Sequence, residues 1–127
     1  MLKKIRRFVK MTIAVSSTEK SMSGTADLRF GRCKYFAVYN TLTKECTFVE
    51  NEAINSNQGA GIAASQTVAG LKAEVVLTGN LGPKALNVLN AAGINGYKIG
   101  QTTIENAISA FQEKKLSQIT EPGRPQK

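Results

Sequence analysis

One segment, residues 74–93, most narrowly limits the folds open to this chain. Its sequence, EVVLTGNLGPKALNVLNAAG, begins with an apolar run that predicts a short buried strand. A turn rich in glycine and asparagine follows, and Pro83 stands where the first helical residue is expected. The helix itself is predicted from an apolar face at helical spacing, formed by Ala85, Val88, Leu89 and Ala92. The segment therefore predicts a strand–turn–helix unit, which is typical of α/β proteins.

The alternation of strands and helices extends along most of the chain. Helices are predicted near residues 60–71, 83–92 and 102–115, and Thr102 with Glu105 predicts a capping box for the last one. Because strand–helix–strand units place neighbouring strands parallel, we expect a five-stranded mixed sheet of order 3-2-1-4-5, with strand 2 antiparallel. The five predicted strands cover residues 11–16, 34–39, 45–50, 74–78 and 96–99.

The chain divides into three parts by composition. Residues 11–116 are predicted to form one domain, and residues 117–127, which include a Pro-Gly pair, a flexible C-terminal tail. Residues 1–10 contain five cations and no acid, and they are predicted to be a basic extension. The net charge is +8, so +8 − 5 leaves only +3 for residues 11–127. Nucleic-acid binding is therefore not expected of the domain and would depend on the extension.

The rest of the composition excludes several classes of function. The chain has no histidine, which removes the commonest general base and the commonest metal ligand. Its two cysteines do not form a secreted disulfide framework, and no apolar run is long enough to cross a membrane, so we expect a cytoplasmic protein. The first predicted strand carries no acid, and Asp27 is the only aspartate, which argues against two-metal nuclease chemistry.

The predicted topology gathers several loops at one edge of the sheet. Ligands of such sheets favour the crevice at the carboxyl ends of the strands, beside the point where the connections reverse. The Asn80 turn opens there, and the start of the antiparallel second strand brings residues 29–33 to the same rim. We therefore expect the binding site in this crevice.

Three segments together resemble the dinitrogenase iron–molybdenum cofactor biosynthesis family, which includes NifX, NafY and the C-terminal domain of NifB. They are residues 27–36 (DLRFGRCKYF), residues 58–62 (QGAGI) and residues 78–83 (TGNLGP), the last followed by Ala-Ala-Gly-Ile94. The resemblance implies a ribonuclease H-like three-layer fold and a role in carrying iron–sulfur or molybdenum-containing clusters. Members of the family often have a histidine where this chain has Arg29, so a histidine-ligated cofactor is not expected here.

Two glycine-rich helix starts supply candidate amide donors. The first N–H groups of a helix lack internal partners and attract anions, and glycines let a ligand approach the backbone closely. A purely structural role, as tight turns or close helix–sheet packing, is the alternative for both segments. The candidate residues at these starts are Gly59, Gly61, Gly79, Asn80 and Gly82.

The Arg29–Cys33 segment adds side chains suited to an anionic metal cluster. Arg29 and Arg32 are candidate partners of anionic oxygens, and a surface pair between Arg29 and Asp27 is the alternative. Cys33 is a candidate thiolate ligand of a soft metal, with a pKa lowered by its cationic neighbours, or else a small apolar residue. The resemblance to the family places Phe30 and Gly31 in the same site.

These features predict a non-enzymatic carrier or scaffold of an iron–sulfur or iron–molybdenum type cluster or its precursor. Its expected partners are that cluster and, by the resemblance, proteins of cofactor assembly. The alternative is a regulatory or interaction module of the same fold, which binds a small anion or a partner protein without metal.

Overall fold

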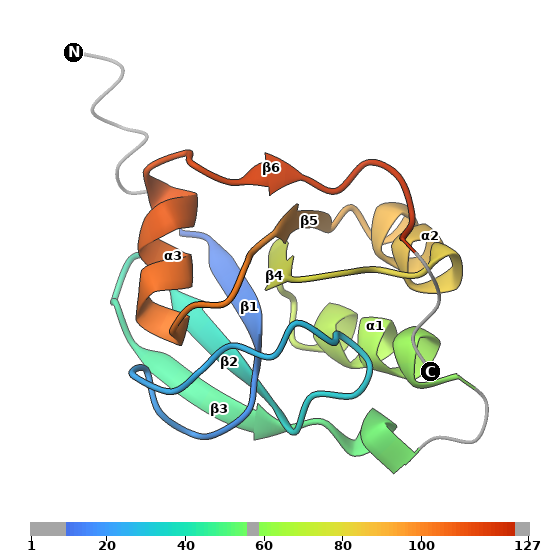
Figure 1. Cartoon of the computed structure of the whole chain (residues 1–127), viewed down its shortest axis with the longest axis horizontal. Helices are drawn as coiled ribbons and strands as arrows, with labels where there is room; N and C mark the ends of the chain where they lie inside the picture. The colour runs from blue at the N-terminus through green and yellow to red at the C-terminus, as the bar shows by residue number, and fades with distance from the viewer. Residues whose placement is uncertain (1–9, 56–58, 124–127) are drawn as a thin grey trace.

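The computed structural model describes residues 10–55 and 59–123, which form one sheet flanked by helices (Figure 1). The strands lie in the order β3-β2-β1-β4-β5-β6. Along the chain the elements are β1 (Thr12–Ser17), β2 (Tyr35–Asn40), β3 (Cys46–Glu50), the short 3₁₀ helix η2 (Glu52–Asn55), α1 (Ala60–Gly70), β4 (Val75–Thr78), α2 (Pro83–Ala91), β5 (Asn95–Lys98), α3 (Ile104–Gln112) and β6 (Ser117–Gln118).

Strand β1 lies at the centre of the sheet, and all six of its residues are buried. It pairs antiparallel with β2 and parallel with β4, while β4 pairs parallel with β5. The predicted order of the first five strands and the antiparallel direction of β2 are therefore confirmed. The ribonuclease H-like classification stays a prediction.

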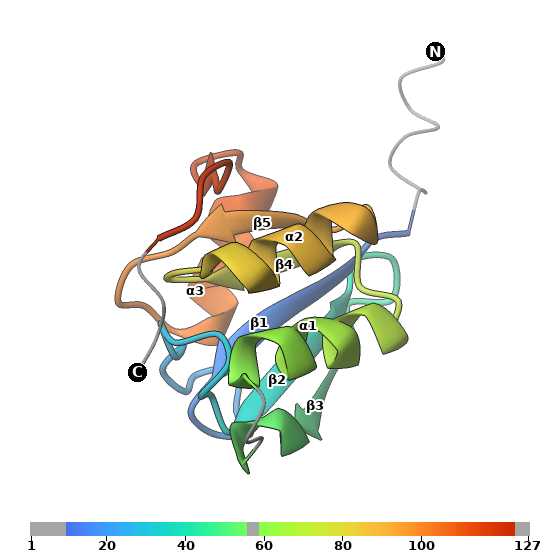
Figure 2. The ribbon, with the colours of Figure 1, turned by 90° about the vertical axis from the view of Figure 1, so that its right-hand side faces the viewer.

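The helices cover both faces of the sheet, which gives three layers. Helices α1 and α2 lie side by side on one face, and α3 covers the other (Figure 2). Because side chains alternate along a strand, β1 contributes to two separate cores. Ala14 packs beneath α1 and α2, whereas Ile13 and Val15 pack toward α3.

The sheet has a sixth strand, so the prediction of five strands was wrong. Residues 117 and 118, assigned to a flexible tail, pair antiparallel with β5. The backbone N–H of Ile119 donates to the Gly96 carbonyl at 2.7 Å, and that of Gly123 donates to the Leu81 carbonyl at 2.8 Å. Both residues of β6 are exposed, so no apolar pattern marks this strand in the sequence.

Helix α3 starts one residue later than the capping-box prediction required. Its N-cap is Thr103, whose hydroxyl accepts a hydrogen bond from the backbone N–H of Asn106. Thr102 lies outside this cap, and its carbonyl accepts a hydrogen bond from the Ala26 backbone N–H. Within residues 10–55 and 59–123, no helix combines the length and apolar character needed to cross a bilayer. The predicted extension lies almost entirely outside the described residues.

Candidate functional site

A pocket of about 320 Å³ opens between the N-terminal ends of α1 and α2. Figure 2 shows α1 and α2 together on one face of the sheet. The lining residues place the pocket at the starts of these two helices, and the start of α2 follows the carboxyl end of β4. Its walls combine backbone at two helix starts, apolar side chains and two cations. The lining residues are Phe30, Arg32, Gly59, Ala60, Gly61, Ile62, Asn80, Gly82, Pro83, Lys84 and Ala85.

Both helices begin without a side-chain cap. The N-cap residues are Gly59, with φ of 107°, and Gly82, and neither helix has an acidic residue in its first turn. An acid or a capping hydroxyl there would offset the positive end of the helix dipole and occupy its free N–H groups. Two uncompensated helix N-termini therefore face one pocket, which favours a negatively charged ligand.

The loop that carries Phe30 and Arg32 forms the opposite wall. Phe30 is buried and packs against Phe36, with ring centroids 5.5 Å apart. Gly31 fits closely against the first turn of α1, since a Cβ placed on it would lie 2.7 Å from the Gly61 nitrogen. Only glycine allows this approach, so Gly31 sets the distance between the loop and α1.

Arg32 is held at the pocket by the η2 turn. Its Nη1 donates to the Ile54 carbonyl at 3.1 Å, and the side chain lines the pocket. This bond uses one of the five N–H donors of the guanidinium. Arg32 is therefore positioned to interact with an anion through its remaining donors.

Asn51 is a positioning residue of this loop that the sequence analysis did not identify. It is almost completely buried at the end of β3, and its Nδ2 donates to the carbonyls of Gly31 at 3.1 Å and Cys33 at 2.8 Å. Its Oδ1 accepts from the Ala53 N–H at 3.1 Å. Asparagine just after a strand is a known signal for such a local turn, but its contacts with the Gly31 and Cys33 carbonyls are long-range.

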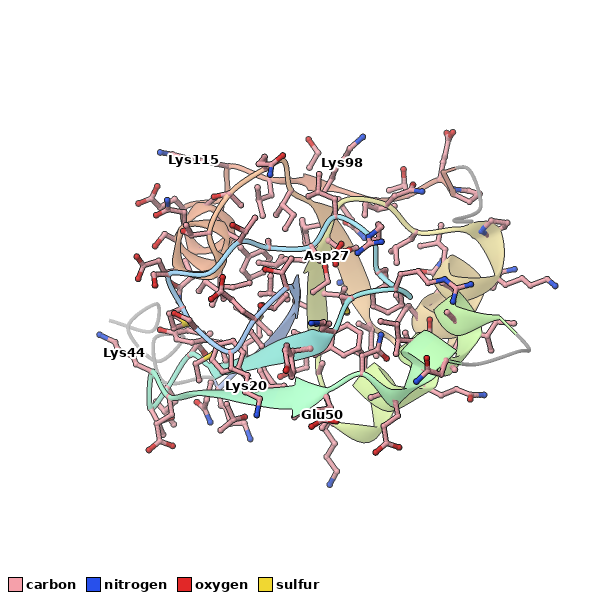
Figure 3. The ribbon with its side chains drawn as sticks, turned by 60° about the horizontal axis from the view of Figure 1, so that its bottom comes forward. Lys20, Asp27, Lys44, Glu50, Lys98 and Lys115 are labelled. Carbon is pink, nitrogen blue, oxygen red and sulfur yellow. The ribbon has the colours of Figure 1, made fainter. Side chains whose placement is uncertain are left out.

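Arg29 does not line the pocket. It forms a two-pronged ion pair with Asp27, from Nε to Oδ1 at 3.1 Å and from Nη2 to Oδ2 at 3.0 Å. The hydrogen bond and the charge of Asp27 raise the pKa of Arg29. Figure 3 shows Asp27 near the middle of the molecule, whereas Lys44, Lys98 and Lys115 point outward at its edges. The ion-pair interpretation of Arg29 accounts for its geometry.

Ser16 attaches the Asp27 loop to the carboxyl ends of two strands. Its hydroxyl donates to the Asp27 carbonyl, and its Oγ lies 2.9 Å from the Thr78 hydroxyl of β4. All three residues are buried. The loop that leads to Phe30 therefore starts from a fixed point on the sheet.

Cys33 is sealed inside the protein, and the prediction of a lowered pKa was wrong. The side chain has no exposed surface, belongs to the core beneath α1 and α2, and does not line the pocket. Burial raises the pKa of its thiol to about 12, against weaker opposing hydrogen bonds from the Ser17 backbone and the Asn51 side chain. The flanking cations do not lower this pKa, because their charged ends do not lie in the core with the sulfur.

Residues of the Asn80 turn differ in what they face. Gly82 lines the pocket, whereas Gly79 packs against Leu28, whose Cβ would lie 2.5 Å from a Cβ at that glycine. Asn80 lines both this pocket and a neighbouring one of about 270 Å³ formed with the 117–123 segment. Gly79 therefore allows the turn to pack closely against Leu28, and Asn80 lies at the boundary between the two pockets.

The pocket unites most but not all of the predicted site residues. Arg29, Gly31, Cys33 and Gly79 lie outside its lining, and among them Gly31 shapes it indirectly. No cluster of three histidine, cysteine or carboxylate side chains suited to a metal ion occurs within residues 10–55 and 59–123. The site residues that it does unite are Phe30, Arg32, Gly59, Gly61, Asn80 and Gly82.

Comparisons with known proteins point to one family. The sequence profile described as dinitrogenase iron-molybdenum cofactor matches residues 10–114. An uncharacterized protein of Methanocaldococcus jannaschii is 33% identical over 93 residues, which span 71% of this chain and 79% of that protein. The apo form of the orange protein from Desulfovibrio gigas has a similar structure, with 34% identity, a TM-score of 0.86, and 90% of this chain and 97% of that chain covered. A Thermotoga protein described provisionally as NifB gives 32% identity and a TM-score of 0.79, with the same two coverages.

Proposed function

The chain belongs to the dinitrogenase iron–molybdenum cofactor family, and we propose that it is a non-enzymatic carrier or scaffold for an iron–sulfur or iron–molybdenum type cluster or its precursor. The observation that carries this proposal is the charge character of the pocket. Two uncapped helix N-termini, Arg32 and Lys84 meet there, and none of its described lining residues is acidic. Proteins of cofactor assembly are the proposed partners that deliver or receive the cargo.

The chemistry of the pocket suits a metal–sulfur anion as cargo. Inorganic sulfide and oxide groups accept hydrogen bonds, and the backbone amides in the first turns of α1 and α2, which no side chain of the N-cap residues caps, are oriented donors. Phe30, Ile62 and Pro83 give the pocket an apolar wall that excludes water from a weakly hydrated cluster surface. The protein would thus hold the cargo through donors and charge.

A thiolate bond from Cys33 would need a change in the loop. The sulfur is buried on the core side, so residues 30–33 must move before it can reach a metal in the pocket. Replacing Cys33 by alanine separates the two modes of holding the cargo. Binding through amides and Arg32 survives the replacement, whereas thiolate ligation does not.

The test is anaerobic reconstitution with iron, sulfide and molybdate, followed by metal analysis and a visible absorption spectrum. A coloured complex of fixed stoichiometry is expected. Arg32→Gln should weaken it strongly, whereas Arg29→Gln removes the same charge outside the pocket and should change it little. Absence of metal uptake, or equal losses in the two variants, would refute the proposed site.

A second candidate function follows from the same pocket. Its polar groups are cations and N–H donors, which select for negative charge and not for a metal. A regulatory module that binds a small anion or a partner protein without metal would use them equally well. A thermal shift with inorganic phosphate, and none with tetrathiomolybdate or iron and sulfide, would favour this function over a cluster carrier.

A further inference from the structure

Asn51 uses its side-chain amide on three separate backbone groups. Its Nδ2 donates to the carbonyls of Gly31 and Cys33, and its oxygen accepts from the Ala53 N–H. The same Nδ2 makes a longer bond to the Cys33 sulfur, at 3.7 Å. The residue is 2% exposed, so water does not replace these bonds if they are lost.

The two carbonyls flank Arg32 in the chain. Fixing the backbone on both sides of a residue fixes the direction in which its side chain leaves the loop. The loop cannot compensate by shifting toward α1, because Gly31 already lies against the first turn of that helix. Asn51 therefore determines where the Arg32 side chain starts.

Asn51 also determines where the Arg32 side chain ends. The guanidinium donates to the Ile54 carbonyl, which belongs to η2. Asn51 directly precedes this turn and is bonded to it, because its carbonyl accepts from the Ile54 N–H at 3.2 Å and its Oδ1 accepts from the Ala53 N–H. Both the backbone position of Arg32 and the contact of its guanidinium with η2 thus depend on Asn51.

We infer that Asn51 is a positioning residue for anion binding, which acts by holding Arg32 at the pocket between α1 and α2. The inference rests on the proposed function, because it assigns a role in binding at that same pocket. Asn51 itself does not line the pocket and touches no ligand there.

The substitution Asn51→Asp removes the bonds that the Asn51 Nδ2 donates. Aspartate has the same shape and keeps the acceptor for Ala53, but its ionised carboxylate has no hydrogen to give to the two carbonyls. Asn40→Asp is the matched control, because Asn40 uses only its Oδ1, as acceptor from the N–H groups of Leu42 and Thr43. Asn51→Ser, whose hydroxyl keeps one donor, replaces Asn51→Asp if that protein does not fold.

A double-mutant cycle with Arg32→Gln distinguishes positioning from a general effect on folding. Tetrathiomolybdate and inorganic phosphate are the two probes, titrated by calorimetry under conditions in which every variant is folded. Removing a charged hydrogen bond to an anion lowers the affinity about 10- to 100-fold. We expect Asn51→Asp to lose affinity by this amount, Asn40→Asp to match the wild type, and Asn51→Asp to cause no further loss in Arg32→Gln protein. Wild-type affinity in Asn51→Asp, or a loss that adds fully to that of Arg32→Gln, would overturn the inference.

A second readout keeps the inference testable if the wild type binds neither probe, a result that would count against the proposed function. In Cys46→Ala protein, Cys33 is the single thiol, and its rate of modification by a thiol reagent reports opening of the loop. We expect Asn51→Asp to raise this rate at least tenfold in the absence of denaturant, with little dependence on added urea, and Asn40→Asp to leave it unchanged. A rate that stays at the wild-type value, or rises only with global unfolding, would show that Asn51 does not hold the loop.

Discussion

Raising the pH from 7 to 10 is expected to destabilise this protein through the buried thiol of Cys33. Burial raises the pKa of that thiol from 9.0 to about 12 in the folded state. The folded protein thus keeps the proton that the unfolded chain releases above pH 9. The contribution to stability is complete below pH 9 and is lost as the pH rises toward about 12.

The magnitude follows from the two pKa values. At pH 10 most of the unfolded thiol is ionised and almost none of the folded thiol is, which corresponds to a loss of about 1 kcal/mol relative to pH 7. At pH 9 the loss is well under about 1 kcal/mol. The loss of stability therefore develops well above neutral pH.

Urea unfolding at pH 7 and pH 10 measures this loss when variants are compared. Cys33→Ala removes the thiol, and we expect its free energy of unfolding to fall by about 1 kcal/mol less than that of the wild type between pH 7 and pH 10. The other side chains are common to both proteins, so their contributions to the pH dependence cancel in this comparison. Cys46→Ala is the control, because Cys46 is only partly buried and this protein retains Cys33. Equal pH dependence of Cys33→Ala and Cys46→Ala would refute the argument that the Cys33 thiol is desolvated.

Three further predictions concern the pocket and its supports. Gly31→Ala should lower the free energy of unfolding by about 1–3 kcal/mol, because the added Cβ overpacks against α1. Gly70→Ala should raise it by about 0.5–1 kcal/mol, because a Cβ there meets no atom within 4 Å. Urea unfolding of both variants tests this, and equal effects would contradict the close approach at Gly31. Asn51→Asp should lower the free energy of unfolding by about 2 kcal/mol or more, while Asn40→Asp should stay within about 0.5 kcal/mol of the wild type. Lys84→Glu should stabilise α2 by about 0.3–1 kcal/mol, because an acid suits a helix N-terminus. The same substitution should abolish tetrathiomolybdate binding, because it puts a negative charge in the pocket. Retained binding would place the anion elsewhere.

Much of the fold was predictable because it depends on local patterns. The apolar run of β4 and the helical face of α2 appear directly in residues 74–93, and both elements lie where these patterns predict them. The family resemblance, which rests on three short segments, was confirmed by the match over residues 10–114. Strand β6 was missed because its two residues are exposed and bury no apolar face, so only its pairing with β5 in the folded protein reveals it.

The sequence alone determined the two glycine-rich helix starts and the positions of most strands and helices along the chain, because backbone conformation and the period of apolar residues are encoded locally. Tertiary structure decided which side chains of the 29–33 loop face the pocket. Arg32 and Phe30 line it, while Cys33 turns into the core. The reason is that bonds from Asn51, 18 to 20 residues further along the chain, fix the loop carbonyls. No pattern within the loop itself carries that information.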